Sequence, residues 1–204
     1  ASIQKYEKPI NIAGLVVERR TGLVKAYAGS SSYIDNDRKG SVNYLTALRS
    51  PGSTLKPLIY AKALERKLIE EGHIFKDSQI QRGGYTPSNF DKIFNGQVTL
   101  KEALTRSLNI PAIQTLELIG VNGFENSLRT FIAQDIMQNY KSGLTAAVGG
   151  FYLSAENLAE IYLEIADPGH SSKLRFDTEE PELTSSHLIN SNTSEKILRI
   201  MSQR

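Results

Sequence analysis

The stretch Leu48–Tyr60, LRSPGSTLKPLIY, places a serine and a lysine three residues apart directly after a Pro-Gly turn. From Ser53 onward, apolar residues recur at the spacing of one helix face. Pro57 falls in the first turn, where a missing amide hydrogen costs least. The pattern therefore predicts a core helix over residues 53–71, with Ser53 and Lys56 on the same face.

A serine and a lysine in this arrangement can act as a nucleophile and its base. The Lys56 amine would take the proton of the Ser53 hydroxyl. A lysine with its ordinary pKa of about 10.4 is protonated at neutral pH. Burial and the positive end of a helix dipole both lower that pKa. The alternative is an ordinary helix start with a lysine that reaches solvent, and so short a motif needs a second element.

The triplet Ser107-Leu108-Asn109 supplies a second polar element. Thr99 and Glu102 stand in capping-box register before it and predict a helix start. Pro111 disfavours helical geometry in the residue before it and suits the first position of a new helix. We therefore expect the triplet at a corner between two helices, with polar side chains free to face a cleft.

Composition limits the classes of protein that fit. The chain has 204 residues, of which 40% are apolar, so we expect one domain or one large piece of one. The formal net charge is +2, without a basic stripe, so nucleic acid is not an expected partner. The absence of cysteine excludes disulfides and thiolate catalysis. His73, His170 and His187 are isolated, and no metal site is predicted.

The order of the segments predicts an α+β fold, in which a short antiparallel sheet is followed by a helical subdomain. Two β-rich runs joined by RRTG indicate a hairpin around Gly22, and Asn192 is the expected cap of a final helix. In chain order we predict a strand pair over 10–28, a loop over 29–52, the nucleophile helix over 53–71, a loop over 73–98, a helical region over 99–167 and a helix over 192–204.

Two segments resemble the active-site motifs of a known family. ALRSPGSTLKPLIYAKALE and ALTRSLNIPAIQTLELIG are similar to the first and second motifs of penicillin-binding protein transpeptidases, relatives of the serine β-lactamases. The signature set of that family is S-x-x-K, S-x-N and K-[ST]-G. The resemblance is closest to the bifunctional, class A branch and its 1C type. It extends through GLVVERRTGLVKAYAGS, GGYTPSNFD and AVGGFYLSAENLAEIYLEIAD, and it implies a β-lactamase/transpeptidase-like fold.

The resemblance also implies a reaction, serine D,D-transpeptidation in peptidoglycan cross-linking. Ser53 would be the nucleophile and Lys56 the base, Ser107 would relay a proton, and Asn109 would bind the substrate amide. The implied partners are peptidoglycan stem peptides and β-lactam antibiotics, without a metal or cofactor. The implied location is periplasmic or extracytoplasmic, with the parent protein anchored in the inner membrane by a segment absent here.

The third motif of the family is not found at its expected place. Lys141-Ser142-Gly143 matches its letters, but it follows Asn109 too soon and helical segments still come after it, so we interpret it as a decoy. A second S-x-N triplet, Ser41-Val42-Asn43, precedes Ser53 in a predicted loop and is set aside. We expect the chain to stop before the strand that bears the third motif. The 204 residues alone should then turn over poorly or not at all.

Two other functions stay open at this point. One is a noncatalytic module that binds β-lactams or stem peptides, and the other is a structural piece of a cell-wall synthesis complex. A β-lactamase is disfavoured, because no glutamate is placed to activate a deacylating water.

Tyr85 and Asn89 are candidates for the mouth of the cleft. An acidic cluster is interpreted as a solvated loop and consists of Asp177, Glu179, Glu180 and Glu182.

Overall fold

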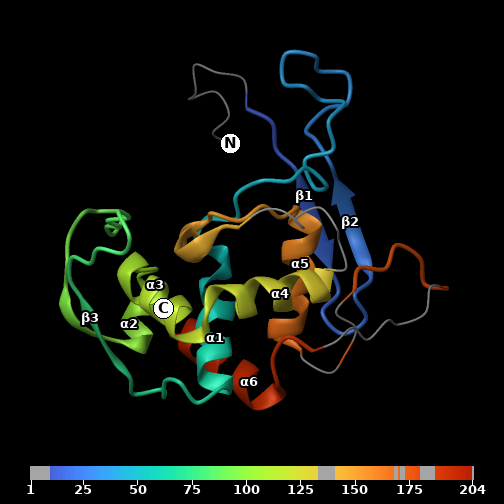
Figure 1. Cartoon of the computed structure of the whole chain (residues 1–204). Coiled ribbons are helices and arrows are strands. Elements are labelled where there is room, and N and C mark those ends of the chain that lie inside the picture. Colours follow the sequence, from blue (N-terminus) through green and yellow to red (C-terminus); the bar gives the residue numbers. More distant parts are fainter. Residues whose placement is uncertain (1–9, 133–140, 168–169, 171–172, 180–186, 204) are drawn as a thin grey trace.

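The computed structural model describes residues 10–132, 141–167, 170, 173–179 and 187–203. The elements in chain order are β1 Gly14–Val17, β2 Val24–Ala28, the 3-10 helix η2 Gly52–Leu55, α1 Lys56–Glu65, β3 Ile74–Asp77, β4 Gly96–Thr99, α2 Leu100–Thr105, α3 Asn109–Ile119, α4 Val121–Ile132, the 3-10 helix η4 Gly143–Val148, α5 Ala155–Ala166 and α6 Ser191–Met201. β1 pairs with β2, β3 pairs with β4, and the helices lie between these two small sheets (Figure 1).

The hairpin of β1 and β2 lies within the predicted segment 10–28. The two strands are antiparallel, and their register shifts between Val16 and Val17. A bulge of this kind interrupts the regular alternation of side chains between the two faces of the sheet. Gly22 has a φ of 69° in the connecting turn, a conformation that favours glycine.

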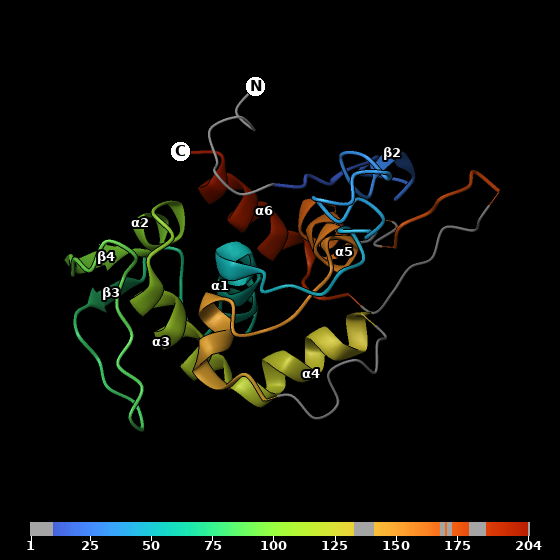
Figure 2. The ribbon, with the colours of Figure 1, turned by 90° about the horizontal axis from the view of Figure 1, so that it is seen from above.

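Helix α1 is the centre of the core. Every residue from Lys56 to Ala61 is buried, and the helix packs against α3, α6 and η4. In Figures 1 and 2, α3, α4, α5 and α6 lie around it. A helix covered on all sides needs no polar face. A polar side chain that begins such a helix must find its partners inside the protein.

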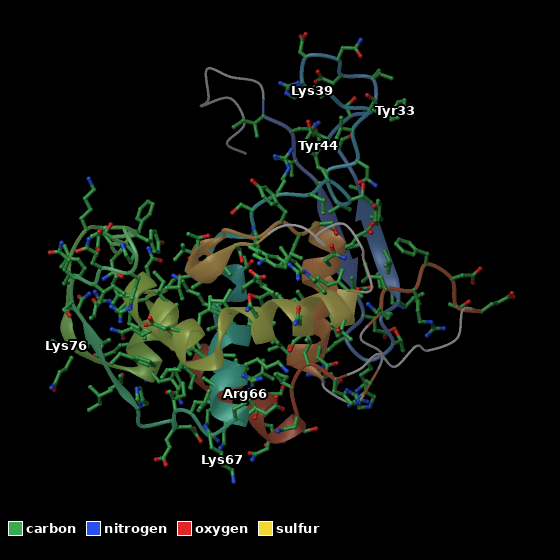
Figure 3. All side chains as sticks on the ribbon, in the orientation of Figure 1. Tyr33, Lys39, Tyr44, Arg66, Lys67 and Lys76 are labelled. Atoms are coloured by element: carbon green, nitrogen blue, oxygen red, sulfur yellow. The ribbon has the colours of Figure 1, made fainter. Side chains whose placement is uncertain are left out.

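The nucleophile helix is shorter than predicted, because α1 ends at Glu65 and not near residue 71. Lys67 adopts a left-handed φ of 56°. Its amide donates to Leu64 O at 3.0 Å, and the Leu68 amide donates to Ala63 O at 2.9 Å. These two bonds form a Schellman motif, which usually uses glycine at this position. Arg66 and Lys67 lie at this end of α1 in Figure 3.

The predicted loop over 73–98 was wrong at both ends, because it contains the second sheet. Ile74 pairs with Thr99 and Asp77 with Gly96 in antiparallel register. Phe75 is buried at 3% exposure and contributes to the core. Each strand has only four residues, and the second begins far along the chain from the first, so no local pattern indicates the pairing.

The capping box predicted at Thr99 and Glu102 is confirmed at the start of α2. Two other helix starts differ from the prediction. Pro111 is the third residue of α3, not the first, and it still lies in the turn where an amide hydrogen has no helical acceptor. α6 is capped by Asn190 and not by Asn192, and its residue Ile197 is buried in the core.

The segment after η4 braces the turn that precedes Ser53. Arg49 and Leu153 exchange backbone hydrogen bonds of 2.9 and 3.0 Å, and Ser50 Oγ donates to Gly149 O at 2.6 Å. Gly149 has a φ of 101°, and a Cβ added there would lie 2.7 Å from Gly52 Cα. The two backbones therefore approach so closely that only glycine fits.

We predict that Gly149→Ala lowers the free energy of unfolding by about 1–3 kcal/mol, from overpacking and a left-handed alanine. Urea denaturation measures the change. The matched control is Gly123→Ala in α4, where the nearest atom to an added Cβ is Arg66 Nη2 at 3.6 Å. Alanine in a helix should there raise stability by about 0.5–1 kcal/mol. Equal effects of the two substitutions would contradict the prediction.

Candidate active site

The turn that carries Ser53 continues directly into α1. Ser53 is the second residue of η2 and is exposed, whereas Lys56 is the first residue of α1 and is only 1% exposed. Pro57 follows at the second helical position, within the first turn as the sequence predicted, although the helix begins at Lys56 and not at Ser53. The nucleophile candidate therefore faces solvent while its lysine neighbour is directed into the protein.

The ammonium of Lys56 is bound by the S-L-N turn. Nζ donates to Ser107 O at 2.6 Å, to Asn109 Oδ1 at 2.7 Å and to Ser107 Oγ at 3.2 Å. Three acceptors match the three hydrogens of an ammonium group. Ser53 Oγ has no hydrogen-bond partner within the part of the chain that the structure describes. In this structure Lys56 is thus joined to the second motif and not to Ser53.

Ser107 has a backbone conformation that places two acceptors on Lys56. Its φ is 54°, in the left-handed region. The Ser107 amide donates to Leu104 O at 3.1 Å, and the Leu108 amide donates to Ala103 O at 2.9 Å. This is a second Schellman motif, which ends α2 and turns the chain toward α3. The corner predicted for the S-L-N triplet is therefore a helix C-terminus with serine where glycine is usual.

Burial lowers the pKa of Lys56 from 10.5 to about 8. The cause is desolvation, which disfavours the charged amine. With this pKa, about a tenth of the Lys56 side chains are neutral at pH 7, compared with about one in three thousand for an unperturbed lysine. The site therefore holds a lysine that can act as a base near neutral pH.

A cavity of about 330 Å³ opens beside these groups. It is lined by Ser53, Thr54, Lys56, Pro57, Leu104, Thr105, Ser107, Tyr162 and Met201. Tyr162 comes from α5, and its hydroxyl donates to Thr54 O at 2.9 Å, one residue after Ser53. The structure thus places three of the four predicted site residues on one cavity, and Asn109 adjoins it through its bond to Lys56.

The structure separates the two candidates for the cleft mouth from the cavity. Asn89 is 2% exposed, and its Oδ1 accepts the Asn109 amide at 2.8 Å, so it lies behind the site and not at its mouth. Tyr85 packs against the hydrophobic core. The sequence did not predict the contact of Asn89 with α3 or that of Tyr162 with Thr54. Each residue is distant in the chain from the motif that it contacts.

The two other motif matches, Lys141-Ser142-Gly143 and Ser41-Val42-Asn43, do not line the cavity. Ser142 is 6% exposed, and its amide and hydroxyl both donate to Glu125 Oε1 on α4. Asn43 donates to Tyr27 Oη at 2.6 Å beside β2. Their side chains have structural partners. Of the acidic cluster, Glu180 and Glu182 lie outside the described residues.

Comparisons with known proteins agree with this geometry. The sequence profile described as "Penicillin binding protein transpeptidase domain" matches residues 12–204, so the chain belongs to that family. It is 35% identical to penicillin-binding protein 1C of Escherichia coli (strain K12) over 192 residues, which cover 94% of the chain and 25% of that protein. It is also 35% identical to penicillin-binding protein 1F of Bacillus subtilis (strain 168), over 68% of the chain and 18% of that protein. The predicted likeness to the 1C type is confirmed.

Two solved structures share the fold. The transpeptidase domain of penicillin-binding protein 3 from Burkholderia pseudomallei superposes with a TM-score of 0.74 at 18% identity, over 92% of this chain and 60% of that one. Penicillin-binding protein 1A from Haemophilus influenzae gives 0.62 at 26% identity, over 77% and 23%. The predicted α+β, transpeptidase-like fold is confirmed. The chain spans about a quarter of the length of its Escherichia coli relative.

The pKa of Lys56 predicts a dependence of stability on pH. Because the folded pKa is about 8 and the unfolded value 10.5, the unfolded chain binds more protons between these values. Stability contributed at this residue is therefore lowest below pH 8 and rises up to pH 10.5, by about 3 kcal/mol in all. We expect the unfolding free energy of the wild type, measured in urea relative to Lys56→Met, to increase over this interval. A difference that is constant from pH 7 to pH 10.5 would contradict it.

Proposed function

We propose that this chain is the acylating part of a serine D,D-transpeptidase that cross-links peptidoglycan. One observation carries the proposal: Lys56, buried and with its pKa lowered to about 8, lines the same cavity as Ser53 and Ser107. A general base works best when its pKa lies near the working pH, and it must lie close to the proton that it takes. Membership in the transpeptidase family supports the choice of reaction.

In the proposed acylation, Ser53 Oγ attacks the carbonyl carbon between the two terminal D-alanines of a stem peptide. Neutral Lys56 takes the serine proton, and the backbone amide of Ser53 stabilises the oxyanion. Ser107, 3.2 Å from Lys56 Nζ, passes a proton to the leaving nitrogen. The carbon–nitrogen bond breaks, D-alanine departs, and an ester to Ser53 remains.

The acceptor is proposed to be an amine of a neighbouring stem peptide. Its nitrogen attacks the ester, the bond to Ser53 Oγ breaks, and the proton of the amine returns to the serine. Asn109 Nδ2 donates one hydrogen to Ser88 O at 2.8 Å. Its second hydrogen has no acceptor among the described residues and is free to bind a substrate amide. β-Lactams would inhibit by forming the same ester with Ser53.

The location follows from the substrate. Peptidoglycan lies outside the cytoplasmic membrane, so we place the protein in the periplasm or another extracytoplasmic space, with a membrane anchor in the parent protein. Within the described ranges, no helix is long and apolar enough to span a membrane.

We predict that a fluorescent penicillin labels the full-length protein at Ser53 and that Ser53→Ala abolishes the label. The labelling rate should rise with pH, reach half of its maximum near pH 8 and level off above about pH 9, as Lys56 loses its proton. Gel fluorescence over a pH series measures both. The matched control is Ser41→Ala, in the S-x-N triplet of the loop before the site, which should label like the wild type. Equal labelling of Ser53→Ala would refute the proposal.

The 204 residues alone should label more slowly than the full-length protein. The sequence offers no third motif in its family position. In the family, the strand that bears this motif would supply a second oxyanion-hole amide. Loss of one such donor lowers rates by about 10²–10³. Time courses of labelling for the two proteins at equal concentration give the comparison. Rapid stoichiometric labelling of the 204-residue chain would show that the missing strand is not needed for acylation.

A further inference from the structure

A buried pair of polar side chains lies behind the active-site cavity. Asp77, the last residue of β3, is 0% exposed, and Asn89 is 2% exposed. Asn89 Nδ2 donates to both carboxylate oxygens of Asp77, at 2.9 Å each. Asn95 donates to Asp77 Oδ2 through its amide at 2.9 Å and its side chain at 2.7 Å. In the part of the chain that is described, the carboxylate has no ion-pair partner, so neutral donors satisfy it.

The alternation of β3 explains how the carboxylate is buried. Lys76 lies on the outer face of the strand (Figure 3), and the next side chain, that of Asp77, is directed inward. A buried carboxylate without a cation is stable only when fully hydrogen-bonded. Asp77, together with Ile93 O, which accepts from Asn89 Nδ2 at 2.8 Å, therefore fixes the orientation of the Asn89 amide, with Nδ2 toward the carboxylate and Oδ1 away from it.

The Oδ1 atom of Asn89 meets the first turn of α3. It accepts the amide of Asn109 at 2.8 Å and that of Ile110 at 3.4 Å. Leu108, the residue before α3, provides no side-chain cap. Pro111 has no amide hydrogen, so Asn89 accepts both of the hydrogens that the first three residues of α3 offer. An asparagine from the segment between β3 and β4 thus caps this helix.

The capped residue is the one that binds the base. Asn109 Oδ1 accepts a hydrogen from Lys56 Nζ at 2.7 Å, while Asn109 Nδ2 donates to Ser88 O. Ser88 therefore holds the side chain of Asn109, and Asn89 holds its backbone amide. A continuous path of hydrogen bonds runs from Asp77 through Asn89 and Asn109 to Lys56.

We propose that Asn89, oriented by Asp77, is a positioning residue that holds Asn109 Oδ1 against the Lys56 amine and so sets the rate of acylation. The proposal rests on the proposed function. Asn89 touches neither the cavity nor the substrate and acts only through Asn109. A small displacement of a group that positions the base is enough to slow the reaction by about 10²-fold.

The test uses the full-length protein with Asn89→Ala and a matched control, Asn190→Ala. Asn190 also caps a helix, α6, by accepting the Thr193 amide at 2.9 Å, but among the described residues it makes no hydrogen bond to Lys56, Ser107 or Asn109. Hydrogen exchange by mass spectrometry reports on the amides of Asn109 and Ile110 without any need for activity. We expect exchange there to become about tenfold faster in Asn89→Ala and to stay unchanged in Asn190→Ala. Unchanged exchange in Asn89→Ala would overturn the proposal.

Acylation by a fluorescent penicillin gives the second readout. We expect Asn89→Ala to react about 10- to 100-fold more slowly and Asn190→Ala to stay within about twofold of the wild type. In an Asn109→Ala background, Asn89→Ala should cause no further loss, because its path to Lys56 is already broken.

Additive losses, or equal losses in the two cap variants, would mean a general structural role and overturn the proposal. A wild-type protein that does not react with penicillin would refute the proposed function. The exchange comparison would still decide whether Asn89 positions Asn109.

Discussion

The three hydrogen bonds that the Lys56 ammonium makes to Ser107 O, Ser107 Oγ and Asn109 Oδ1 are the contact on which this structure depends. α1 is enclosed by other helices, so its first side chain cannot reach water easily. A charge removed from water is tolerated only when its hydrogen bonds are replaced. Ser107 and Asn109 replace them, and in doing so they tie the second motif to the first across the core. The same hydrogen bonds therefore stabilise the fold and position the proposed base.

The site is assembled from segments that are distant in the chain. η2 and α1 supply Ser53 and Lys56, the corner between α2 and α3 supplies Ser107 and Asn109, and α5 closes over the nucleophile turn through Tyr162. Each of these segments is braced by a further one. The glycine-rich segment after η4 presses on the turn before Ser53, and the small sheet of β3 and β4 supports the start of α3. The precision of the site therefore depends on long-range packing more than on any single helix.

Local rules predicted the features that local forces decide. The capping box at Thr99 and the hairpin at Gly22 depend on residues within four positions of one another, and both patterns are visible in the sequence. The end of α1 was missed because Lys67 has the left-handed backbone conformation at which a helix usually ends with glycine. Without a glycine, the sequence does not mark this end. The second sheet was missed because its short strands gain their stability from a core contact at Phe75 and a buried network at Asp77, which no periodicity reveals.

For the site, too, the sequence predicted which residues take part but not how they are arranged. The letters of Ser53, Lys56, Ser107 and Asn109 could be found from their motifs and from the family resemblance. Their mutual arrangement could not, because helical spacing places Lys56 beside Ser53, whereas the structure directs its amine to the S-L-N turn. The support from Asn89 was not predictable either. It depends on how a loop folds back over a helix start, and that is a property of the whole chain.

The left-handed backbone of Ser107 places two demands on one residue. A side chain in this conformation costs about 1–2 kcal/mol that glycine would avoid. The Schellman turn would therefore be more stable with glycine, whereas the proposed proton relay requires the hydroxyl. A chain under selection for stability alone would drift toward glycine here. Such a drift would keep the carbonyl that binds Lys56 and the shape of the cavity, yet remove the relay. On the proposed mechanism, a single substitution at Ser107 would therefore separate binding from catalysis.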